Sequence, residues 1–383
     1  MRSEFLPFSP PFVGEEEIRG VTEVLRSGWI SRGPVVSQFE EEFRQKLGAP
    51  AALGLNSGTA GLHLGLQVMG IGPGDEVIVP TITFCASANV VEHVGAKPVL
   101  VDVMDDTLNI DPLAVEAALT DQTRAIMIVH FGGHPAEMDE LIGIAERHGL
   151  KVIEDAAHAF PASYRGEMVG STSRMTAFSF YATKNLTTGE GGMLTGDPEF
   201  IEQAATLSLH GMSRAAWNRY SEASQWYYEV VAPGYKYNMA DLQAAVGRAQ
   251  LVKLESMDQR RREVVRMYAD GLSSIDGIRI PCEKEHVSSA WHLYPIRVHP
   301  DLIQGGRDVF IDRLSERNIG TSVHFIPLHL HPFYRDKYGY VSDDFPVARE
   351  AFEQLVSLPL HPGLTDEDVS DVIEAVELVS TGG

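Results

Sequence analysis

Cysteine is scarce in this 383-residue sequence, and that scarcity excludes two classes of protein. The two cysteines, Cys85 and Cys282, lie far apart in the chain and in no metal-binding spacing. A disulfide-stabilised scaffold and a zinc finger are therefore excluded, and a reducing cytoplasm is the expected compartment.

Long apolar runs are missing as well. The longest are short, such as residues 125–129, whereas a membrane-spanning helix needs about 18 apolar residues. The first residues contain prolines and Glu4, where a secretory signal would keep an unbroken apolar stretch. We therefore expect a soluble cytoplasmic protein.

Basic residues are outnumbered by acidic ones. The chain has 31 Lys and Arg against 53 Asp and Glu, which gives a formal net charge of −22. A chain this acidic repels nucleic acid and anionic membrane surfaces, so neither is an expected partner. Any phosphate-bearing ligand must then be held by local groups that overcome the overall charge.

The residues that are present indicate a folded α/β protein. Hydrophobic residues make up 44% of the chain, and short apolar runs alternate with helical patterns between about residues 50 and 210. This alternation is typical of βαβ units, which build a mostly parallel sheet flanked by helices. The expected strands are residues 51–55, 76–80, 97–103, 125–131, 151–155 and 176–181.

The pattern changes after Asp197. Residues 210–238 are rich in aromatic, glycine and polar residues and predict a long ordered loop, whereas 239–272 predicts a helix. A smaller α+β region follows. We expect three parts: an N-terminal arm or initial helix at 1–29, a large α/β domain at 30–250 and a small C-terminal α+β domain at 251–383.

Three motifs in the large domain carry chemical information. Ser57, Gly58 and Thr59 lie between a strand and a helix, where exposed N–H groups can bind a phosphate, although a simple helix cap gives the same pattern. Asp155 ends an apolar strand, where it can either pair with a cationic ring nitrogen or cap the next helix. His158 follows three residues later and could reach the same ligand.

The third motif is a lysine in a glycine-rich loop. Lys184 follows the strand that ends at Ser179 and precedes Gly189-Glu190-Gly191-Gly192. Partial burial lowers the pKa of a lysine and makes its amine nucleophilic, although a solvated surface lysine is the other interpretation. A phosphate cradle, an acidic residue and a lysine, in this order, fit pyridoxal 5′-phosphate (PLP).

The sequence resembles the DegT/DnrJ/StrS-type family of PLP-dependent sugar aminotransferases, within the fold type I aminotransferases. The resemblance covers nearly the whole chain. It is carried by residues 27–43 (SGWISRGPVVSQFEEEF), 56–64 (NSGTAGLHL), 74–89 (GDEVIVPTITFCASAN), 153–160 (IEDAAHAF), 178–194 (FSFYATKNLTTGEGGML), 234–247 (GYKYNMADLQAAVG), 290–296 (AWHLYPI), 324–329 (HFIPLH) and 358–360 (LPL).

The resemblance implies a role for each matching residue. Lys184 would form the covalent bond to the cofactor and act as the catalytic base, Asp155 would keep the pyridine nitrogen protonated, and His158 would lie near the ring hydroxyl. The remaining expected cofactor contacts are Phe84, which would stack on the ring, and Ser57, Gly58, Thr59, Ser179, Lys236 and Asn238, which would hold the phosphate. Many relatives have Asn at the position of Lys236, so that single assignment stays open.

The resemblance also implies the partners. L-glutamate would be the amino donor, pyridoxamine 5′-phosphate the form that carries the amino group, and a nucleotide-diphosphate ketosugar the acceptor, in polysaccharide biosynthesis. The expected assembly is a homodimer with shared active sites. Candidate substrate-binding residues are Arg32, Arg214, Arg219, His324 and His329. The HLH sequence at 329–331 has no acidic or Cys partner at metal-ligand spacing, so we expect no metal.

The position of amination and two other functions remain open. His158 and residues 129–139 are more similar to members that act at C4 than to those that act at C3, which more often carry Gln there. Dehydratases on this scaffold can replace the Schiff-base lysine with His, so Lys184 favours transamination. A non-catalytic regulatory homologue would not need a reactive amine.

Overall fold

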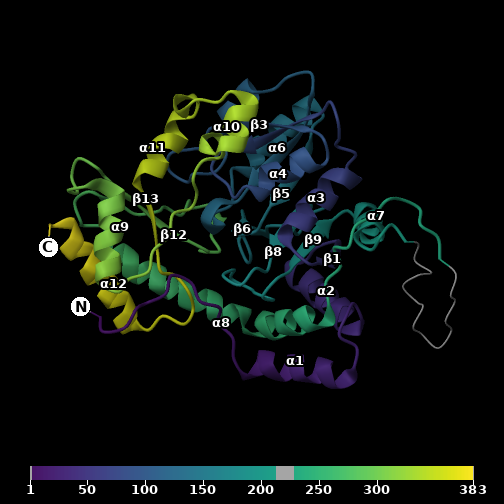
Figure 1. The fold of residues 1–383 in the computed structure, drawn as a ribbon, viewed down its shortest axis with the longest axis horizontal. Coiled ribbons are helices and arrows are strands. Elements are labelled where there is room, and N and C mark those ends of the chain that lie inside the picture. Colours follow the sequence, from purple (N-terminus) through teal and green to yellow (C-terminus); the bar gives the residue numbers. More distant parts are fainter. Residues whose placement is uncertain (1, 213–227, 383) are drawn as a thin grey trace.

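The computed structural model describes residues 2–212 and 228–382. Within them, a seven-stranded sheet forms the centre of the large part of the chain (Figure 1). Its strands are β1 (Ala51–Leu55), β2 (Glu76–Pro80), β3 (Lys97–Val101), β4 (Thr123–Val129), β5 (Lys151–Asp155), β8 (Met175–Ser179) and β9 (Gly192–Gly196). The spatial order is β1-β9-β8-β5-β4-β2-β3.

The sheet is mostly parallel, as the alternation of strands and helices predicts. Every pair among β2, β3, β4, β5 and β8 is parallel, and β9 alone runs antiparallel to its neighbours β1 and β8. Strand β9 is the one strand of this sheet that we did not expect. Its five residues contain two glycines and follow a glycine-rich loop, so neither length nor periodicity indicates a strand.

Helices cover both faces of the sheet, because both faces are apolar. Alternate strand residues point to opposite sides: Val77 and Val79 pack in one buried cluster, and Ile78 packs in another. The helices of this part are α1 (Glu15–Ser27), α2 (Pro34–Leu47), α3 (Gly58–Val68), α4 (Ala86–His93), α5 (Pro112–Ala117), η1 (Phe131–Gly133), α6 (Met138–His148) and α7 (Pro198–Ser208).

The C-terminal part adds a smaller α+β unit. Strands β10 (Ile278–Arg279), β12 (Tyr294–Val298) and β13 (Leu355–Leu358) form an antiparallel sheet, and β11 (Val287–Ser288) joins β6 (Ser163–Tyr164) and β7 (Glu167–Met168) in another. The helices are α9 (Gly306–Glu316), η3 (Leu328–Leu330), α10 (Pro332–Tyr338), η4 (Ser342–Asp344), α11 (Pro346–Gln354) and α12 (Asp366–Ser380).

Helix α8 (Asp241–Leu272) connects the two parts as one continuous helix of 32 residues (Figure 1). Its first half packs in a core with Phe39 and Phe178, whereas its last turns pack in the core around Tyr268 and Tyr294. A boundary at 250 therefore falls inside this helix. The division at 29 and 250 stays a prediction.

The topology brings three strand ends to one edge of the sheet. Strand β5 is parallel to β8, and β1 is parallel to β8 because both are antiparallel to β9. Asp155 and Ser179, which end their strands, and Ser57, two residues after β1, therefore lie at the same edge. In open α/β sheets this carboxyl edge is where ligands bind.

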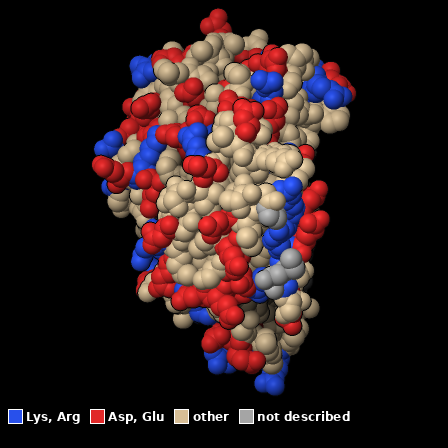
Figure 2. All heavy atoms as spheres, turned by 90° about the vertical axis from the view of Figure 1, so that its left-hand side faces the viewer, with Lys and Arg blue, Asp and Glu red and all other residues tan. Residues whose placement is uncertain are grey.

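The surface reflects the acidic composition. On the face shown in Figure 2, which carries both termini in Figure 1, acidic side chains gather in patches with basic side chains between them. Among the described residues, no helix is both long and apolar enough to cross a bilayer.

Gly247 of α8 lets this helix approach α2, and alanine there should destabilise the fold. A Cβ atom at Gly247 would lie 2.5 Å from the ring of Phe39, which is fully buried between other aromatic rings. We expect Gly247→Ala to lower the free energy of unfolding by about 1–3 kcal/mol in urea titrations. Gly143→Ala in helix α6 is the control, because a Cβ atom there would meet no atom closer than 3.6 Å. This substitution should raise the free energy of unfolding by about 0.5–1 kcal/mol. Equal shifts in the two variants would contradict this packing.

Candidate active site

A cavity of about 340 Å³ opens at the carboxyl edge of the sheet. Its walls come from the ends of β1, β5 and β8, from the segment after β2, and from the C-terminal part. The structure brings together most of the residues that the sequence singles out, namely Ser57, Gly58, Thr59, Phe84, Asp155, His158, Ser179, Lys184 and His324.

The floor of the cavity at β1 is the N-terminus of helix α3. The Ser57 hydroxyl caps this helix and accepts a hydrogen bond from the Ala60 N–H at 3.1 Å. A Cβ atom at Gly58 would lie 3.0 Å from Cβ of Ser179, and one at Gly192 would lie 2.4 Å from the carbonyl carbon of Ser57. Both glycines thus allow three chain segments to converge on free N–H groups at the positive end of a helix, which suits a phosphate.

Asp155 supplies a buried carboxylate at the end of β5. Its Oδ2 accepts a hydrogen bond from the Ser87 hydroxyl at 2.7 Å, and its Oδ1 accepts one from the Ala157 N–H at 3.1 Å. Burial raises the pKa of Asp155, and these two neutral donors offset the rise only in part. A cationic N–H in the cavity would stabilise the ionised carboxylate.

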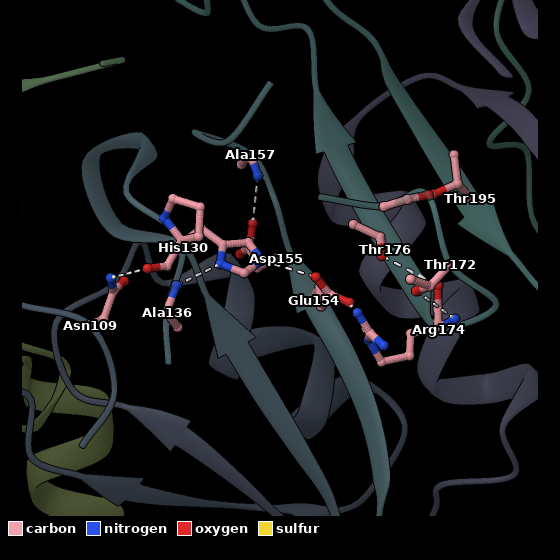
Figure 3. A network of polar contacts seen from close by, with 12 residues as sticks. Asn109, His130, Ala136, Glu154, Asp155, Ala157, Thr172, Arg174, Thr176 and Thr195 are labelled. Atoms are coloured by element: carbon pink, nitrogen blue, oxygen red, sulfur yellow. Dashed lines mark hydrogen bonds and ion pairs between the residues drawn. The ribbon is translucent and has the colours of Figure 1, made fainter. Parts of the chain in front are cut away.

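A polar network on the other side of β5 fixes this strand end (Figure 3). Glu154 accepts hydrogen bonds from His130 at 3.1 Å and from Arg174 at 2.7 Å. Burial opposes ionisation of Glu154, but the His130 hydrogen bond and the Arg174 charge together lower its pKa. The Ala136 N–H donates to Nδ1 of His130, so the proton of this imidazole is on Nε2 and points to Glu154.

Lys184 lies in the cavity wall with a perturbed amine. The loop that carries it begins with a turn in which the Lys184 N–H donates to the Tyr181 carbonyl at 2.9 Å. Burial lowers the pKa of Lys184 to about 8, although the negative charge of Asp155 opposes this shift. About a tenth of the amine is therefore neutral at pH 7, far more than for a lysine in water, and a nucleophile or base requires this neutral form.

His158 is a neutral imidazole in the same wall. Burial lowers its pKa well below the ordinary range, and the charge of Lys184 lowers it further. The Gly132 N–H donates to Nδ1 at 3.3 Å, so Nε2 carries the proton and can donate to a ligand. The ring of Phe325 stacks on His158 at a centroid distance of 5.8 Å.

Phe84 lies with its ring open to the cavity. Its side chain is 58% exposed although it belongs to a buried segment, which is unusual for a large apolar residue. An aromatic ligand that stacks on it would remove this apolar surface from water. This placement is compatible with the expected stacking position.

Four expected contacts, Lys236, Asn238, Arg32 and His329, do not line the cavity. Lys236 and Asn238 do not line the cavity of their own chain: the Lys236 amine donates to the Asn238 side chain at 2.7 Å beside Asn56. Arg32 lies outside the cavity lining and pairs with Glu40 at 3.1 Å.

His329 is fully buried and lies outside the cavity lining, with its Nδ1 2.8 Å from the Thr81 hydroxyl. The expectation that it touches substrate alongside His324 therefore has no support from its position, because the chain turns it into the core after Pro327. Arg214 and Arg219 lie outside the described residues.

The structure adds residues that the sequence motifs did not single out. Ser87 was missed, although it lies inside a motif that carries the family resemblance. Phe8 reaches the cavity from the N-terminal arm, where its ring lies 5.4 Å from that of His324, and Ser9 donates to the Thr183 carbonyl at 3.3 Å. An extended arm has no periodicity that would have indicated this contact.

Among the described residues, no group of three or more His, Cys, Asp or Glu is placed to hold a metal ion.

Comparisons with known proteins agree with this geometry. The model of the DegT/DnrJ/EryC1/StrS aminotransferase family matches residues 11–377. The chain belongs to this family. The spore coat polysaccharide biosynthesis protein SpsC of Bacillus subtilis is 51% identical over 383 residues, which cover 100% of this chain and 98% of that protein.

Solved structures show the same architecture. The putative sugar aminotransferase Spr1654 from Streptococcus pneumoniae is 36% identical and superposes with a TM-score of 0.91 in both its PMP form and its PLP form, over 99% of this chain and 98% or 99% of that chain. DesV from S. venezuelae, solved in complex with a ketimine intermediate, is 38% identical with a TM-score of 0.89, over 98% of this chain and 99% of that chain. The present aminotransferase therefore has the fold type I architecture and uses PLP.

The residues of this chain fit that cofactor. The N-terminus of α3 offers N–H groups for the phosphate. Lys184 offers an amine of lowered pKa for the aldehyde, and Asp155 at the end of β5 offers a buried carboxylate for the ring nitrogen. Burial raises the pKa of Asp155, and a cationic group beside this carboxylate would lower the pKa again, as a protonated ring nitrogen does. This aminotransferase supplies a complementary group for each polar part of PLP.

The cofactor-free protein should show the lowered pKa of Lys184 directly. Trace acylation with acetic anhydride labels only neutral amines, so the rate of labelling at Lys184, read by peptide mass spectrometry, should rise with a midpoint near pH 8. The exposed Lys46, labelled in the same samples, is the internal control. A Lys184 midpoint equal to that of Lys46 would contradict the burial of its amine.

Proposed function

We propose that this enzyme transfers an amino group from L-glutamate to a nucleotide-linked ketosugar, at C4 of the sugar. The observation that carries the proposal is the single cavity that holds Lys184, Asp155 and the N-terminus of α3. Its structural neighbours Spr1654, described as a putative sugar aminotransferase, and DesV support a sugar acceptor.

The proposed roles follow from the geometry. When bound, PLP accepts the electron pair that is left when a proton leaves the substrate carbon. Lys184 takes up that proton at Nζ and returns it, for which its lowered pKa is suited. Asp155 holds a proton on the ring nitrogen, and Ser87 orients that carboxylate by its hydrogen bond at 2.7 Å. Ser57, Gly58, Thr59 and Ser179 bind the phosphate.

The outer wall of the cavity suits an acceptor rich in hydroxyl groups. Thr83, Tyr181, Glu190 and His324 line it together with the aromatic rings of Phe8 and Phe325. Burial lowers the pKa of His324 to about 4, so this imidazole is neutral at physiological pH and can exchange hydrogen bonds with a hydroxyl. Apolar faces beside a few polar groups are typical of sites for small molecules.

The proposal includes two subunits at each site. Lys236 and Asn238 lie on the surface beside Asn56, which precedes the proposed phosphate contacts, and not in the cavity of their own chain. Supplied from a partner, they would complete the phosphate site and bring positive charge to a protein with a net charge of −22. The proposed homodimer has this shared arrangement, in the cytoplasm.

Product analysis with paired substrates tests the proposal. We expect NMR to show amination of 4-keto nucleotide sugars and little or none of their 3-keto isomers, with L-glutamate as donor. Lys184→Ala should lose activity by at least about 10⁴-fold, because it removes both nucleophile and base, whereas Lys46→Ala should retain it. Clean amination at C3 would contradict the proposed amination at C4. Dehydration of the sugar without amination would contradict the proposed transamination.

A further inference from the structure

A histidine without an assigned role lies beside Lys184. His292 belongs to the segment 289–293 between β11 and β12, is only 6% exposed and lines the cavity. Its Nε2 lies 3.5 Å from Nζ of Lys184. This contact joins the lysine loop of the large part to the beginning of the C-terminal sheet.

The hydrogen bonds of Asn185 determine which nitrogen of His292 carries the proton. The Asn185 amide N–H donates to the Ala290 carbonyl at 2.6 Å, so its Oδ1 is the atom that faces Nδ1 of His292, at 3.2 Å. An amide oxygen only accepts hydrogen bonds, and Nδ1 must therefore donate. The neutral imidazole then has its lone pair on Nε2, the atom next to Lys184.

His292 stays neutral in this position. Burial lowers its pKa well below the ordinary range, and the positive charges of Lys184 and Arg261 lower it further. The neighbouring ring of His158, at a centroid distance of 4.4 Å, has the opposite arrangement, with its proton on Nε2. The lysine amine therefore has a fixed acceptor in His292.

We propose that His292 is a positioning residue for Lys184, whose free amine donates a hydrogen bond to Nε2 of His292. When Lys184 acts as base, the C–H bond of the substrate breaks, an N–H bond forms on Nζ, and the electron pair left on carbon passes to the cofactor. The ammonium that results is buried, and His292 stabilises it while restricting its rotation. The inference rests on the role of Lys184 proposed above and adds the group that holds it.

Two amide substitutions of different length test this role. In His292→Asn the short side chain retains the contact with Asn185 but does not reach Lys184. In His292→Gln the longer side chain places an amide oxygen near the position of Nε2. His134→Asn is the control, because His134 is also a buried, hydrogen-bonded histidine but contacts Pro135 and Lys284 instead.

The first readout is the acylation midpoint of Lys184 in the cofactor-free protein. Loss of an acceptor destabilises the ammonium, so we expect His292→Asn to lower the midpoint by about one pH unit, with His292→Gln and His134→Asn unchanged. The second readout is the reaction of the PLP-loaded enzyme with glutamate. We expect His292→Asn to lower kcat about tenfold or more with a smaller change in KM, and His292→Gln to recover most of that loss.

An Asn variant with the wild-type midpoint, or a Gln variant as impaired as Asn in both readouts, would overturn the proposal in favour of a purely structural histidine. A wild-type midpoint near 10.4 would overturn it by showing that the amine is not buried. Because the acylation measurement needs neither cofactor nor sugar, its outcome is independent of whether a ketosugar is the acceptor.

Discussion

Exclusion of water from one lysine amine is the constraint on which the proposed chemistry of this protein depends. In water, the amine of Lys184 would be protonated at physiological pH and unable to attack an aldehyde or remove a proton. In the cavity its pKa falls to about 8 because the surrounding chain replaces water, and the charge of Asp155 opposes a further decrease. The amine is thus both available as a nucleophile and able to accept a proton.

The remaining features keep this environment in place. Strands β1, β5 and β8 end at one edge, which brings a helix N-terminus, a carboxylate and the lysine loop within one cavity. Glycines at 58 and 192 remove the side chains that would separate these segments. The Glu154 network holds the end of β5 from the opposite side (Figure 3), and the N-terminal arm contributes Phe8 to the cavity wall.

Much of this arrangement can be predicted from sequence, because it depends on local order. The strands of a parallel sheet run in the same direction, so the strands that end in Asp155 and Ser179 place both residues at the same edge. Strand β9 was not predictable in the same way, since its pairing with β1 and β8 is non-local and its glycines suggest a loop. The boundary expected at 250 falls within the continuous helix α8, because the two halves of this helix pack in different hydrophobic cores.

Contacts between distant segments account for most of what the sequence did not reveal. Ser87 and Asp155 are 68 residues apart, and His292 and Lys184 are 108 apart, so no spacing rule connects them. His329 shows the reverse case: it was expected to contact substrate, but the fold buries it against Thr81. The proposed role of Lys236 and Asn238 depends on a second subunit, whose position a single sequence does not specify.

The most direct test of the account is a covalent one. The protein, loaded with PLP and reduced with borohydride, should carry the reduced cofactor as a stable adduct on the peptide that contains Lys184, with no adduct in Lys184→Ala. An adduct on another lysine, or none on any peptide, would contradict the claim that this buried amine is the point at which the cofactor is attached.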